Sequence, residues 1–340
     1  MPALVVTGGF GFLGGNFLRW RHKRHPRSAV INIDCLTYAS GTDNPGEARS
    51  GRNYAEYRLD LVNLRRLKKI WPAGPVTVVH FAAETHVDRS LFDAQPFMRT
   101  NVLGTHSLVE LAREFPVRRL IIISTDEVYG PTPAQKTFGE NQPLAPTNPY
   151  AAAKAAADLL ALAYRRTYGV PVVILRSVNV CGPRQHPEKF VPLFITNALA
   201  GQPLPLYGDG HQERDWLWVE DFCAAVQCLV EARTVKHPVY HVAARNHLRN
   251  IEVARTIIGL VGCSRKLLRK VADRPGHDRR YALDDRRFRR EFGWRPQTSW
   301  AESIHQTVAW YKENADWVGR RTQRSFYEYY RRQYGWRLNG

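Results

Sequence analysis

The sequence has 340 residues, of which 44% are hydrophobic and 24% charged, and this composition is typical of a globular chain with about two domains. Its formal net charge of +18 favours anionic partners, namely nucleic acid, a membrane surface or phosphorylated small molecules, although most of the basic residues are spread along the chain and fit solvated helix faces. Five cysteines without C-x-x-C spacing, no leader-like N-terminus and no run of about 18 apolar residues argue against disulfides, a metal site, secretion and membrane spanning, so we expect a cytoplasmic protein.

The N-terminal segment has the pattern of a dinucleotide cradle. An apolar run from Ala3 to Thr7 predicts a buried strand, and the glycine-rich turn from Gly8 to Gly14 opens a helix whose N-terminus can receive a pyrophosphate. A second strand, Ala29 to Ile33, ends in Asp34, twenty positions after Gly14, where a carboxylate can bind a ribose 2′-hydroxyl. We therefore expect NAD rather than NADP, because Asp34 would repel a 2′-phosphate.

Strands and helices continue to alternate along the first half of the chain. The next predicted elements are a strand at Tyr57 to Leu61, a helix at about Leu64 to Trp71, a strand at Val76 to Ala83 and a helix at Pro96 to Glu114. This alternation predicts an α/β fold with a doubly wound parallel sheet, whose ligands lie beyond the carboxyl ends of the strands. Asp60, Ala82 and Ala83 end strands at that edge, although Asp60 could instead cap a helix and the alanines could simply permit close packing.

Two adjacent carboxylates follow a further strand. Leu120 to Ile123 is an apolar, β-branched run, as expected of a strand buried on both faces, and it leads through Thr125 into Asp126 and Glu127. Neighbouring carboxylates at such a position are costly unless water, hydrogen bonds or a chemical task keep them there. The pattern favours a site of proton chemistry, and the alternative is a solvated turn.

An alanine-rich helix follows a proline-rich loop and carries a Y-x-x-x-K motif. Tyr150 and Lys154 lie one turn apart on the same face of this helix, which ends near Tyr168. A lysine ammonium close to a phenol favours the phenolate, so we expect the pKa of Tyr150 to fall from about 10 towards a range useful for a base. The motif is common on ordinary helices and gains specificity from the preceding cradle and threonine.

Motifs along nearly the whole chain carry a family resemblance. They are Thr7-Gly-Gly-Phe-Gly-Phe-Leu-Gly14, Asp34-Cys-Leu-Thr-Tyr38, His80-Phe-Ala-Ala-Glu-Thr-His-Val-Asp-Arg-Ser90, Ser124-Thr-Asp-Glu-Val-Tyr-Gly130, Tyr150 with Lys154, Pro187-Glu-Lys189, Pro205-Leu-Tyr207, Arg214-Asp-Trp216 and Arg274-Pro-Gly-His-Asp-Arg-Arg-Tyr281. With these motifs the chain resembles the extended short-chain dehydrogenase/reductases and, within them, the nucleoside-diphosphate-glucose 4,6-dehydratases, most of all the dTDP-glucose enzymes. Epimerases and decarboxylases of the superfamily share the cradle and Y-x-x-x-K but usually lack the Asp-Glu pair, so this pair decides the subclass.

The resemblance implies an NAD-dependent carbon–oxygen lyase that converts dTDP-glucose into dTDP-4-keto-6-deoxyglucose and water. Tyr150, with Lys154 beside it, would take the proton of the 4-hydroxyl while hydride leaves C4 for NAD, and Thr125 would hold that oxygen. Glu127 would then remove the C5 proton and Asp126 would protonate the departing 6-hydroxyl, before hydride returns to C6.

The family pattern also implies the residues of the two binding sites. Those expected at the cofactor are Gly8, Gly11, Phe12, Leu13, Gly14, Asp34, Leu36, Thr37, Asp60, Leu61, Phe81, Ala82, Ala83, Thr85, Thr100, Tyr150 and Lys154. Those expected at the substrate are Thr85, Thr125, Asn179, Lys189, Phe190, Pro205, Tyr207, Arg214, Asn250, Arg274, His277 and Tyr334. Among the latter, Arg214, Arg274 and Lys189 would hold the diphosphate.

By the same resemblance, residues 1–179 plus 216–244 would form a Rossmann domain that binds NAD, and residues 180–215 plus 245–340 a smaller α/β domain that binds the nucleotide sugar. A homodimer paired through the helices that begin near Pro96 and Tyr150 is also implied, with no nucleic-acid or membrane partner. Three alternatives stay open. The net charge would allow a nucleic-acid-binding protein that kept a dehydrogenase fold. Val178-Asn-Val-Cys-Gly-Pro183 departs from the usual dTDP-type motif towards UDP-glucose 4,6-dehydratases, and a nucleotide-sugar 4-epimerase would follow if the carboxylates had no chemical role.

Overall fold

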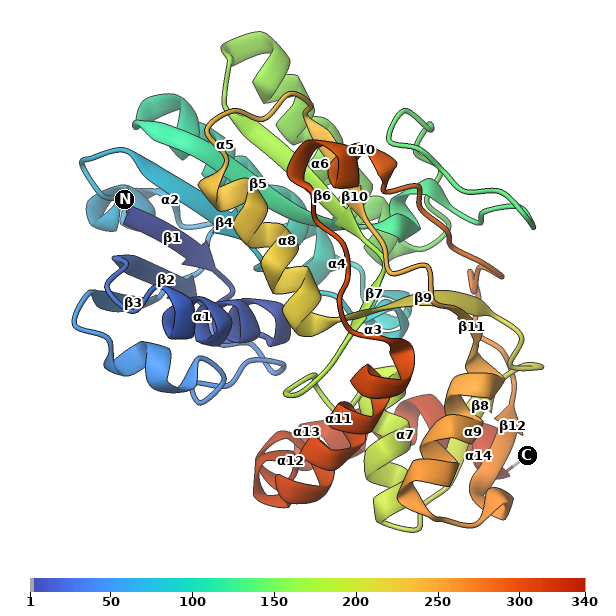
Figure 1. Ribbon diagram of the computed structural model, residues 1–340. Coiled ribbons are helices and arrows are strands. Elements are labelled where there is room, and N and C mark those ends of the chain that lie inside the picture. Colours follow the sequence, from blue (N-terminus) through green and yellow to red (C-terminus); the bar gives the residue numbers. More distant parts are fainter. Residues whose placement is uncertain (1–2, 340) are drawn as a thin grey trace.

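Seven parallel strands form the central sheet of the computed structural model, which describes residues 3–339 (Figure 1). In spatial order they are β10 (Val239–Val242), β6 (Val172–Ser177), β5 (Val117–Thr125), β4 (Val76–His80), β1 (Ala3–Thr7), β2 (Val30–Asp34) and β3 (Tyr54–Arg58). The apolar run in β5 is fully buried from Leu120 to Ile122, because neighbouring strands and helices cover it on every side. This strand order is that of a doubly wound sheet, so the predicted Rossmann-like α/β fold is confirmed.

Helices cover both faces of this sheet. One face carries α1 (Phe12–Arg24), η1 (Gly46–Ser50), α8 (Val219–Glu231) and α10 (Arg286–Phe292), and the other carries α2 (Leu64–Ile70), α5 (Gly104–Glu114) and α6 (Pro149–Tyr168) (Figure 1). Phe17 and Phe222 lie in the core of the first face, and Leu67 and Leu111 in that of the second. The sheet is therefore buried on both sides, which explains why its inner strands are continuous apolar runs.

A smaller α/β part lies beyond the carboxyl ends of the parallel strands (Figure 1). Its strands are β7 (Asn179–Cys181), β9 (Glu213–Trp218) and β11 (His247–Arg249) in one sheet, and β8 (Leu204–Tyr207) and β12 (Leu268–Val271) in another. Its helical elements are α7 (Phe190–Leu199), α9 (Asn250–Val261), η4 (Arg265–Leu267), α11 (Trp300–Glu313), α12 (Ala315–Arg321), α13 (Arg324–Tyr330), the π-helical turn η5 (Arg331–Gly335) and α14 (Trp336–Asn339). Trp216, Ile257 and Tyr311 belong to a separate hydrophobic core of this part.

The bounds of the predicted strand at Tyr57 to Leu61 are wrong. The observed strand β3 spans Tyr54–Arg58 and so begins and ends earlier in the sequence. β3 is an edge strand that pairs only with β2, and most of its side chains are exposed, so it lacks an apolar run. Leu59 and Leu61, which suggested the strand, are buried in the segment that follows it and line the cavity described below.

Strand β4 ends at His80, before the predicted end at Ala83. The residues that follow it leave the ladder and pack against the glycine-rich turn after β1. A Cβ atom on Gly8 would lie 2.5 Å from the backbone nitrogen of Ala82, which is too close for any side chain. Ala82 therefore borders the cradle, as predicted, but from a loop and not from a strand.

The predicted helix from Pro96 to Glu114 is divided by a π-helical turn. After the short helix α3 (Val87–Phe92), the chain forms α4 (Gln95–Phe97), the turn η2 (Met98–Leu103) and then α5. Within the turn, the amide of Asn101 donates to the carbonyl of Glu84 at 3.0 Å and accepts from its N–H at 2.9 Å. The interruption thus places Asn101 where it fixes the loop that follows β4.

The chain passes back to the large sheet late in the sequence. Leu283, Phe288 and Trp294 pack with Tyr240 in the core of the first face.

The predicted division into two domains stays a prediction. Among the described helices, none combines the length and the apolar character that crossing a membrane requires.

Candidate active site

A cavity of about 1010 Å³ lies between the carboxyl edge of the large sheet and the smaller part. It begins at the glycine-rich turn after β1, passes the end of β5 and reaches Tyr334 near the C-terminus. Of the residues predicted for the catalytic, cofactor and substrate sites, all line this cavity except Leu36 and Lys154. Residues far apart in the sequence are therefore brought to one place.

The glycine-rich turn leaves room for a ligand at the N-terminus of α1. Gly14 is required by packing, since a Cβ there would lie 2.3 Å from the carbonyl oxygen of Gly8. Gly11 differs, because its Cβ would meet only that same oxygen, at 3.3 Å. Gly11 is also the N-cap of α1 and offers no side chain to the free N–H groups of the first turn. These groups fit the pyrophosphate of a dinucleotide.

Asp34 is buried at the end of β2 and is held by backbone donors. Its carboxylate accepts hydrogen bonds from the N–H of Phe10 at 2.9 Å and of Leu36 at 2.8 Å. Burial raises the pKa of Asp34, and these hydrogen bonds oppose the rise. Leu36 thus contributes its backbone to the site while its side chain lies outside the cavity.

Asp60 does not cap a helix. Helix α2 is capped by Asn63, whose side chain accepts from the N–H of Arg66 at 3.1 Å. The Asp60 carboxylate accepts from the N–H of Val62 at 2.9 Å and pairs with Arg99 at 2.7 Å. Asp60 therefore lies in the cavity wall and not at a helix N-terminus.

The carboxyls of Asp126 and Glu127 lie in different environments. Both belong to the short helix η3 (Asp126–Tyr129), directly after β5. Asp126 is 3% exposed, and burial together with the charge of Glu127 raises its pKa to about 8. The hydroxyl of Thr125 donates to Asp126 Oδ1 at 3.1 Å, and Asn148 donates to Glu127 Oε2 at 3.3 Å. Asp126 is therefore set up to hold a proton at neutral pH.

Within residues 3–339, Asp126 Oδ2 has no hydrogen-bond partner although it is buried. An unsatisfied buried carboxyl oxygen is costly, and in a cavity wall it points to a partner supplied by a ligand.

The predicted lowering of the Tyr150 pKa by Lys154 is wrong for the chain by itself. Burial raises the pKa of Tyr150, and the charge of Glu127 raises it further. Lys154 does not line the cavity and donates from Nζ to the carbonyl of Ile123 at 2.6 Å. Burial also lowers the pKa of this lysine, with Asp158 opposing the change. The sequence spacing correctly predicts that Tyr150 and Lys154 share one face of the helix, but it does not show that both side chains are buried.

Cationic side chains line the far end of the cavity. Arg274 pairs through Nε with Asp88 at 3.3 Å, and its buried Nη1 has no partner among the described residues. Arg214 is held by the carbonyl of Asp278 at 3.0 Å, and Lys189 donates to a backbone carbonyl of the loop after β4. A guanidinium with free donors in a cavity suits a phosphate.

Aromatic rings form the adjacent wall. The ring centroids of Tyr207 and Tyr334 are 5.9 Å apart, and the Tyr207 hydroxyl donates to Asp88 at 2.7 Å. Such a wall beside the cations fits a nucleoside diphosphate, whose base can pack on the rings.

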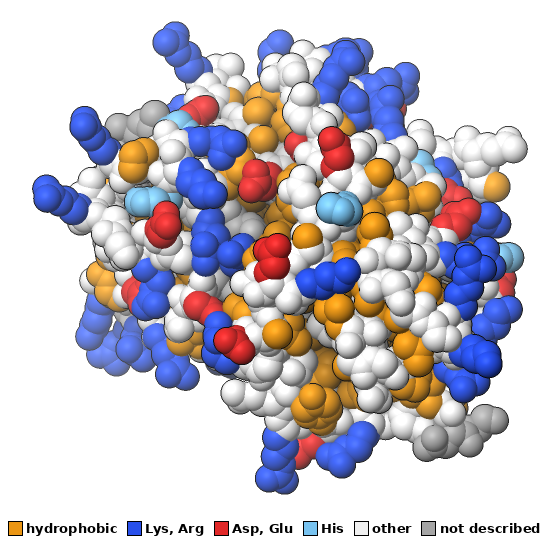
Figure 2. Space-filling view, turned by 60° about the horizontal axis from the view of Figure 1, so that its bottom comes forward, with side chains coloured by type: hydrophobic (Ala, Val, Ile, Leu, Met, Phe, Trp, Pro, Cys, Tyr) orange, Lys and Arg blue, Asp and Glu red, His pale blue; other side chains and the backbone are white. Residues whose placement is uncertain are grey.

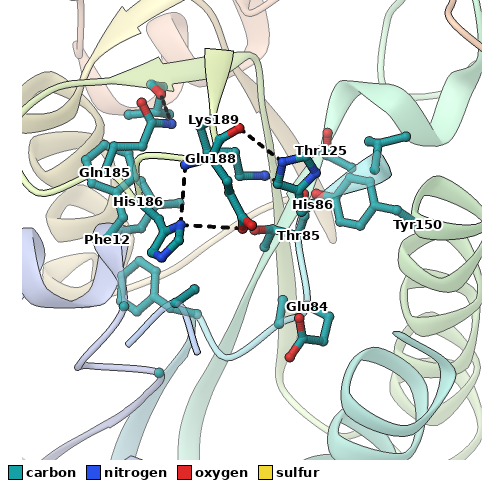
Figure 3. A pocket seen from close by; sticks show the side chains of 18 of the residues that line it. Phe12, Glu84, Thr85, His86, Thr125, Tyr150, Gln185, His186, Glu188 and Lys189 are labelled. Atoms are coloured by element: carbon teal, nitrogen blue, oxygen red, sulfur yellow. Dashed lines mark hydrogen bonds and ion pairs between the residues drawn. The ribbon is translucent and has the colours of Figure 1, made fainter. Parts of the chain in front are cut away.

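Glu188 is a buried acid that was not predicted as a site residue, and it connects the smaller part of the protein with the large-sheet part. Glu188 accepts hydrogen bonds from Tyr38 at 2.6 Å and from Arg89 at 2.7 Å, and it lies beside His186 (Figure 3). It lines the cavity, as do His86 and His186. Glu188 stands in the Pro187–Lys189 motif, but no local pattern reveals a partner 99 positions away.

Replacing Asp126 by asparagine is expected to stabilise the folded protein increasingly as pH rises. The unfolded carboxyl has a pKa of about 3.9, whereas the folded one has a pKa of about 8. Between these values the folded state binds the extra proton, so wild-type stability falls with rising pH by up to about 1.4 kcal/mol per pH unit. Asparagine does not titrate and escapes this loss.

Thermal unfolding measured at about pH 5 and pH 8 checks this linkage. The gain in Tm of Asp126→Asn over the wild type should be larger at the higher pH. Asp316→Asn, which changes an exposed acid on α12, serves as the matched control and should show no such trend. A gain independent of pH would contradict the raised pKa.

Similarity to known proteins identifies the family of this chain. Residues 5–307 match the family model described as GDP-mannose 4,6 dehydratase. A dTDP-glucose 4,6-dehydratase of Streptomyces niveus is 44% identical over 318 aligned positions, and the alignment covers 92% of this chain and 94% of that protein. The chain belongs to this 4,6-dehydratase family. The resemblance inferred from the motifs is thereby confirmed.

Other members of the family agree with this assignment. The dTDP-glucose 4,6-dehydratase of Neisseria meningitidis serogroup B is 40% identical over 339 residues, covering 93% of this chain and 95% of that one. The crystal structure of DesIV, a dTDP-glucose 4,6-dehydratase from Streptomyces venezuelae with NAD and TYD bound, superposes with a TM-score of 0.90 at 41% identity and covers 94% and 99% of the two chains.

The fold alone does not separate dehydratases from epimerases. A UDP-glucose 4-epimerase from Thermotoga maritima with UDP-glucose also superposes with a TM-score of 0.84, at 25% identity and with 92% and 99% coverage. Within this fold, the side chains at the end of β5 have to decide the reaction.

Proposed function

We propose that the protein is an NAD-dependent dTDP-glucose 4,6-dehydratase. The observation that carries this proposal is the pair Asp126 and Glu127, two carboxyls in unlike environments that share one cavity with Thr125 and Tyr150. Elimination of water needs a base at C5 and an acid at C6, and adjacent carboxyls held in different environments can supply one of each. The dTDP-glucose enzymes among its relatives support the same reaction.

The cradle fits NAD. Gly8, Gly11 and Gly14 would bring backbone N–H groups to the pyrophosphate, and Asp34 would accept from the adenosine ribose. When bound, NAD supplies the hydride acceptor for C4 and the hydride donor for C6, and its oxidised ring carries a positive charge.

Each side chain at the end of β5 then has one task. Tyr150 would act as a phenolate, which the positive charges of Lys154 and of oxidised NAD would favour against the effect of burial, and its phenolic oxygen takes the proton of the sugar 4-hydroxyl. Thr125 Oγ1 hydrogen-bonds the same sugar oxygen. Glu127 removes the proton from C5, which the 4-ketone has made acidic. Asp126, whose raised pKa of about 8 favours the protonated form at neutral pH, gives its proton to the departing 6-hydroxyl, so that water and not hydroxide leaves.

The test of this function is formation of the 4-keto sugar. Purified protein is incubated with dTDP-, UDP-, CDP- or GDP-glucose, and the keto sugar is detected by its absorbance in alkali, with kcat/KM compared across the nucleotides. We expect dTDP-glucose to be preferred. A clear preference for UDP-glucose would make the protein a UDP-glucose 4,6-dehydratase, and interconversion of glucose and galactose derivatives without loss of water would make it an epimerase.

NAD is expected to bind more tightly than NADP by roughly tenfold or more. A 2′-phosphate would lie near the buried Asp34, and like charges about 4 Å apart repel by roughly 1–4 kcal/mol at intermediate dielectric. Titration of both dinucleotides against the same protein measures the ratio, with Asp34→Ser as the variant expected to reduce it. Equal affinities for the wild type would show that Asp34 does not contact the ribose.

We also propose a homodimer, because helix α6 exposes an apolar stripe. Ala152, Leu159 and Ala163 face solvent along one side of the helix, with Leu159 57% exposed. The neighbouring turn η2 adds Met98 and Leu103, which are 47% and 49% exposed. An apolar face built by two adjacent helical elements is typical of a self-associating surface.

Leu159→Glu is expected to convert the dimer into a monomer, since it puts charges at the centre of the apolar stripe. Light scattering measures the mass in solution. Leu199→Glu is the matched control, because Leu199 is also exposed, at 42%, but lies on α7. A wild-type monomer would contradict the dimer proposal.

We propose no nucleic-acid partner. Figure 2 shows lysine and arginine side chains scattered over the visible face, with acidic side chains between them. Nucleic-acid-binding surfaces instead concentrate basic residues in one patch or stripe.

A further inference from the structure

A buried polar network lies directly behind the catalytic end of β5. Its centre is the ion pair between Arg176 on β6 and Asp158 on α6, with Nε and Oδ2 2.8 Å apart and side chains 3% and 0% exposed. Ser124 on β5 donates to the same carboxylate oxygen at 3.0 Å. Burying such a pair generally costs about as much free energy as it returns, so stability alone is a weak reason to keep it.

The network reaches the turn that carries the carboxyls through Tyr129. His241 contacts the carbonyl of Asp284 with Nδ1 at 3.1 Å, and a carbonyl can only accept, so Nδ1 carries the proton. Nε2 is therefore an acceptor, and the Tyr129 hydroxyl donates to it at 2.6 Å. Arg176 Nη1 donates in turn to the Tyr129 oxygen. The Tyr129 hydroxyl thus donates one hydrogen bond, to His241, and accepts one, from Arg176.

Three members of the network belong to segments that carry catalytic residues, and all of its members except Ser124 stay out of the cavity. Tyr129 ends the helix η3, which begins with Asp126 and Glu127. Asp158 lies one turn beyond Lys154 on α6, and Ser124 precedes Thr125. The network therefore connects the helix that bears Tyr150 with the turn that bears the two carboxyls.

We propose that Tyr129, held by Arg176 and His241, is a positioning residue for the elimination step. This inference rests on the proposed dehydratase function. Tyr129 lies on the same turn as Asp126 and Glu127, whereas Tyr150 is held separately on α6. Removal of the Tyr129 hydroxyl releases the turn and moves the carboxyls, but it leaves the oxidation of C4 to Thr125 and Tyr150. A misplacement of about 1 Å costs about 10² in rate.

The experiment compares Tyr129→Phe with Tyr240→Phe. Tyr240 is the matched control, because its hydroxyl is also hydrogen-bonded, to Glu291 at 2.7 Å, and it lies fully buried on β10 of the same sheet, outside the cavity. Two quantities are followed in single turnovers with dTDP-glucose: the transient absorbance of NADH, which reports C4 oxidation, and formation of the 4-keto-6-deoxy sugar, which reports completion of the elimination.

We expect Tyr129→Phe to lower kcat by about 10² with KM near that of the wild type, and NADH to accumulate before product appears. Tyr240→Phe should keep the wild-type ratio of the two steps, even if its Tm falls. Arg176→Lys keeps a charge beside Asp158 but lacks the branch that reaches Tyr129, so it should show the same accumulation to a smaller extent and provides the test if Tyr129→Phe does not fold.

If the ratio of the oxidation rate to the elimination rate in Tyr129→Phe equals that of the wild type, whether or not both steps are slowed, the positioning role is wrong and the proposed function still stands. A wild-type protein that forms no 4-keto sugar would overturn the proposed function and this inference with it.

Discussion

Replacing Asp126 by asparagine is expected to lower the rate of 4-keto-6-deoxy sugar formation by about 10²–10⁴, while hydride transfer from C4 continues. Asp126 is the buried carboxyl whose pKa is raised to about 8, and it is the proton donor for the departing 6-hydroxyl. An asparagine of the same shape cannot give up a proton at neutral pH. The enzyme should therefore stop after the first step and hold NADH and the 4-keto sugar.

Glu127→Gln removes the base and not the acid, so its effect should differ in one respect. Both variants form NADH, but Glu127→Gln should also suppress exchange of the C5 hydrogen with deuterated solvent, whereas Asp126→Asn should retain that exchange. NADH absorbance and mass spectrometry of the recovered sugar measure the two steps. Asp316→Asn is the control and should behave as the wild type. If both variants formed product at normal rates, the pair would be an ordinary turn and an epimerase would become the better assignment.

Tyr150→Phe is expected to abolish the reaction at its first step, with a loss of about 10²–10⁴ in kcat. The phenolic oxygen is the group that takes the proton of the 4-hydroxyl, and its side chain is buried, so water has little access to replace it. Without that proton transfer, hydride does not leave C4.

The diagnostic result for Tyr150→Phe is the absence of NADH in a single turnover, together with the absence of C5 exchange. Tyr168→Phe on the same helix is the control, because Tyr168 is 53% exposed at the far end of α6 and lies outside the cavity. Accumulation of NADH in Tyr150→Phe would show that another group takes the proton and that Tyr150 acts later in the reaction.

The inner strands β1, β2, β4 and β5 were predicted, whereas the edge strand β3 was misplaced. β1 and β5 are buried on both faces, so their sequences are apolar runs that only an inner strand of a parallel sheet explains. Most side chains of β3 are exposed and it has no such run, and the nearby apolar residues Leu59 and Leu61 shifted the prediction towards the loop. The π-helical turn at Asn101 has no signal in helical periodicity, because the apolar residues on either side keep a helical pattern.

The cavity residues were predictable because family motifs mark them one by one, whereas their electrostatics were not. The spacing of Tyr150 and Lys154 shows that they share a helix face, but the pKa of each depends on burial by segments that are distant in the sequence. The same limit applies to Glu188, whose partners are Tyr38 and Arg89. Such pairs arise from the tertiary arrangement and leave no local pattern.

The contacts of Glu188 bear on how long the cofactor stays bound. The segment around Gln185 and Glu188 borders the same cavity as Phe12 of the cradle, and it is tied to the dinucleotide side by Tyr38 and by a hydrogen bond from Asn16 to the carbonyl of Pro183 at 3.0 Å (Figure 3). With a dinucleotide in the cradle, we expect these hydrogen bonds to slow its release, because they hold the segment at the border of the same cavity. Slow exchange of the cofactor suits a reaction that returns its hydride to the substrate. Each turnover ends with NAD in its oxidised form, so the cofactor does not have to be replaced before the next turnover.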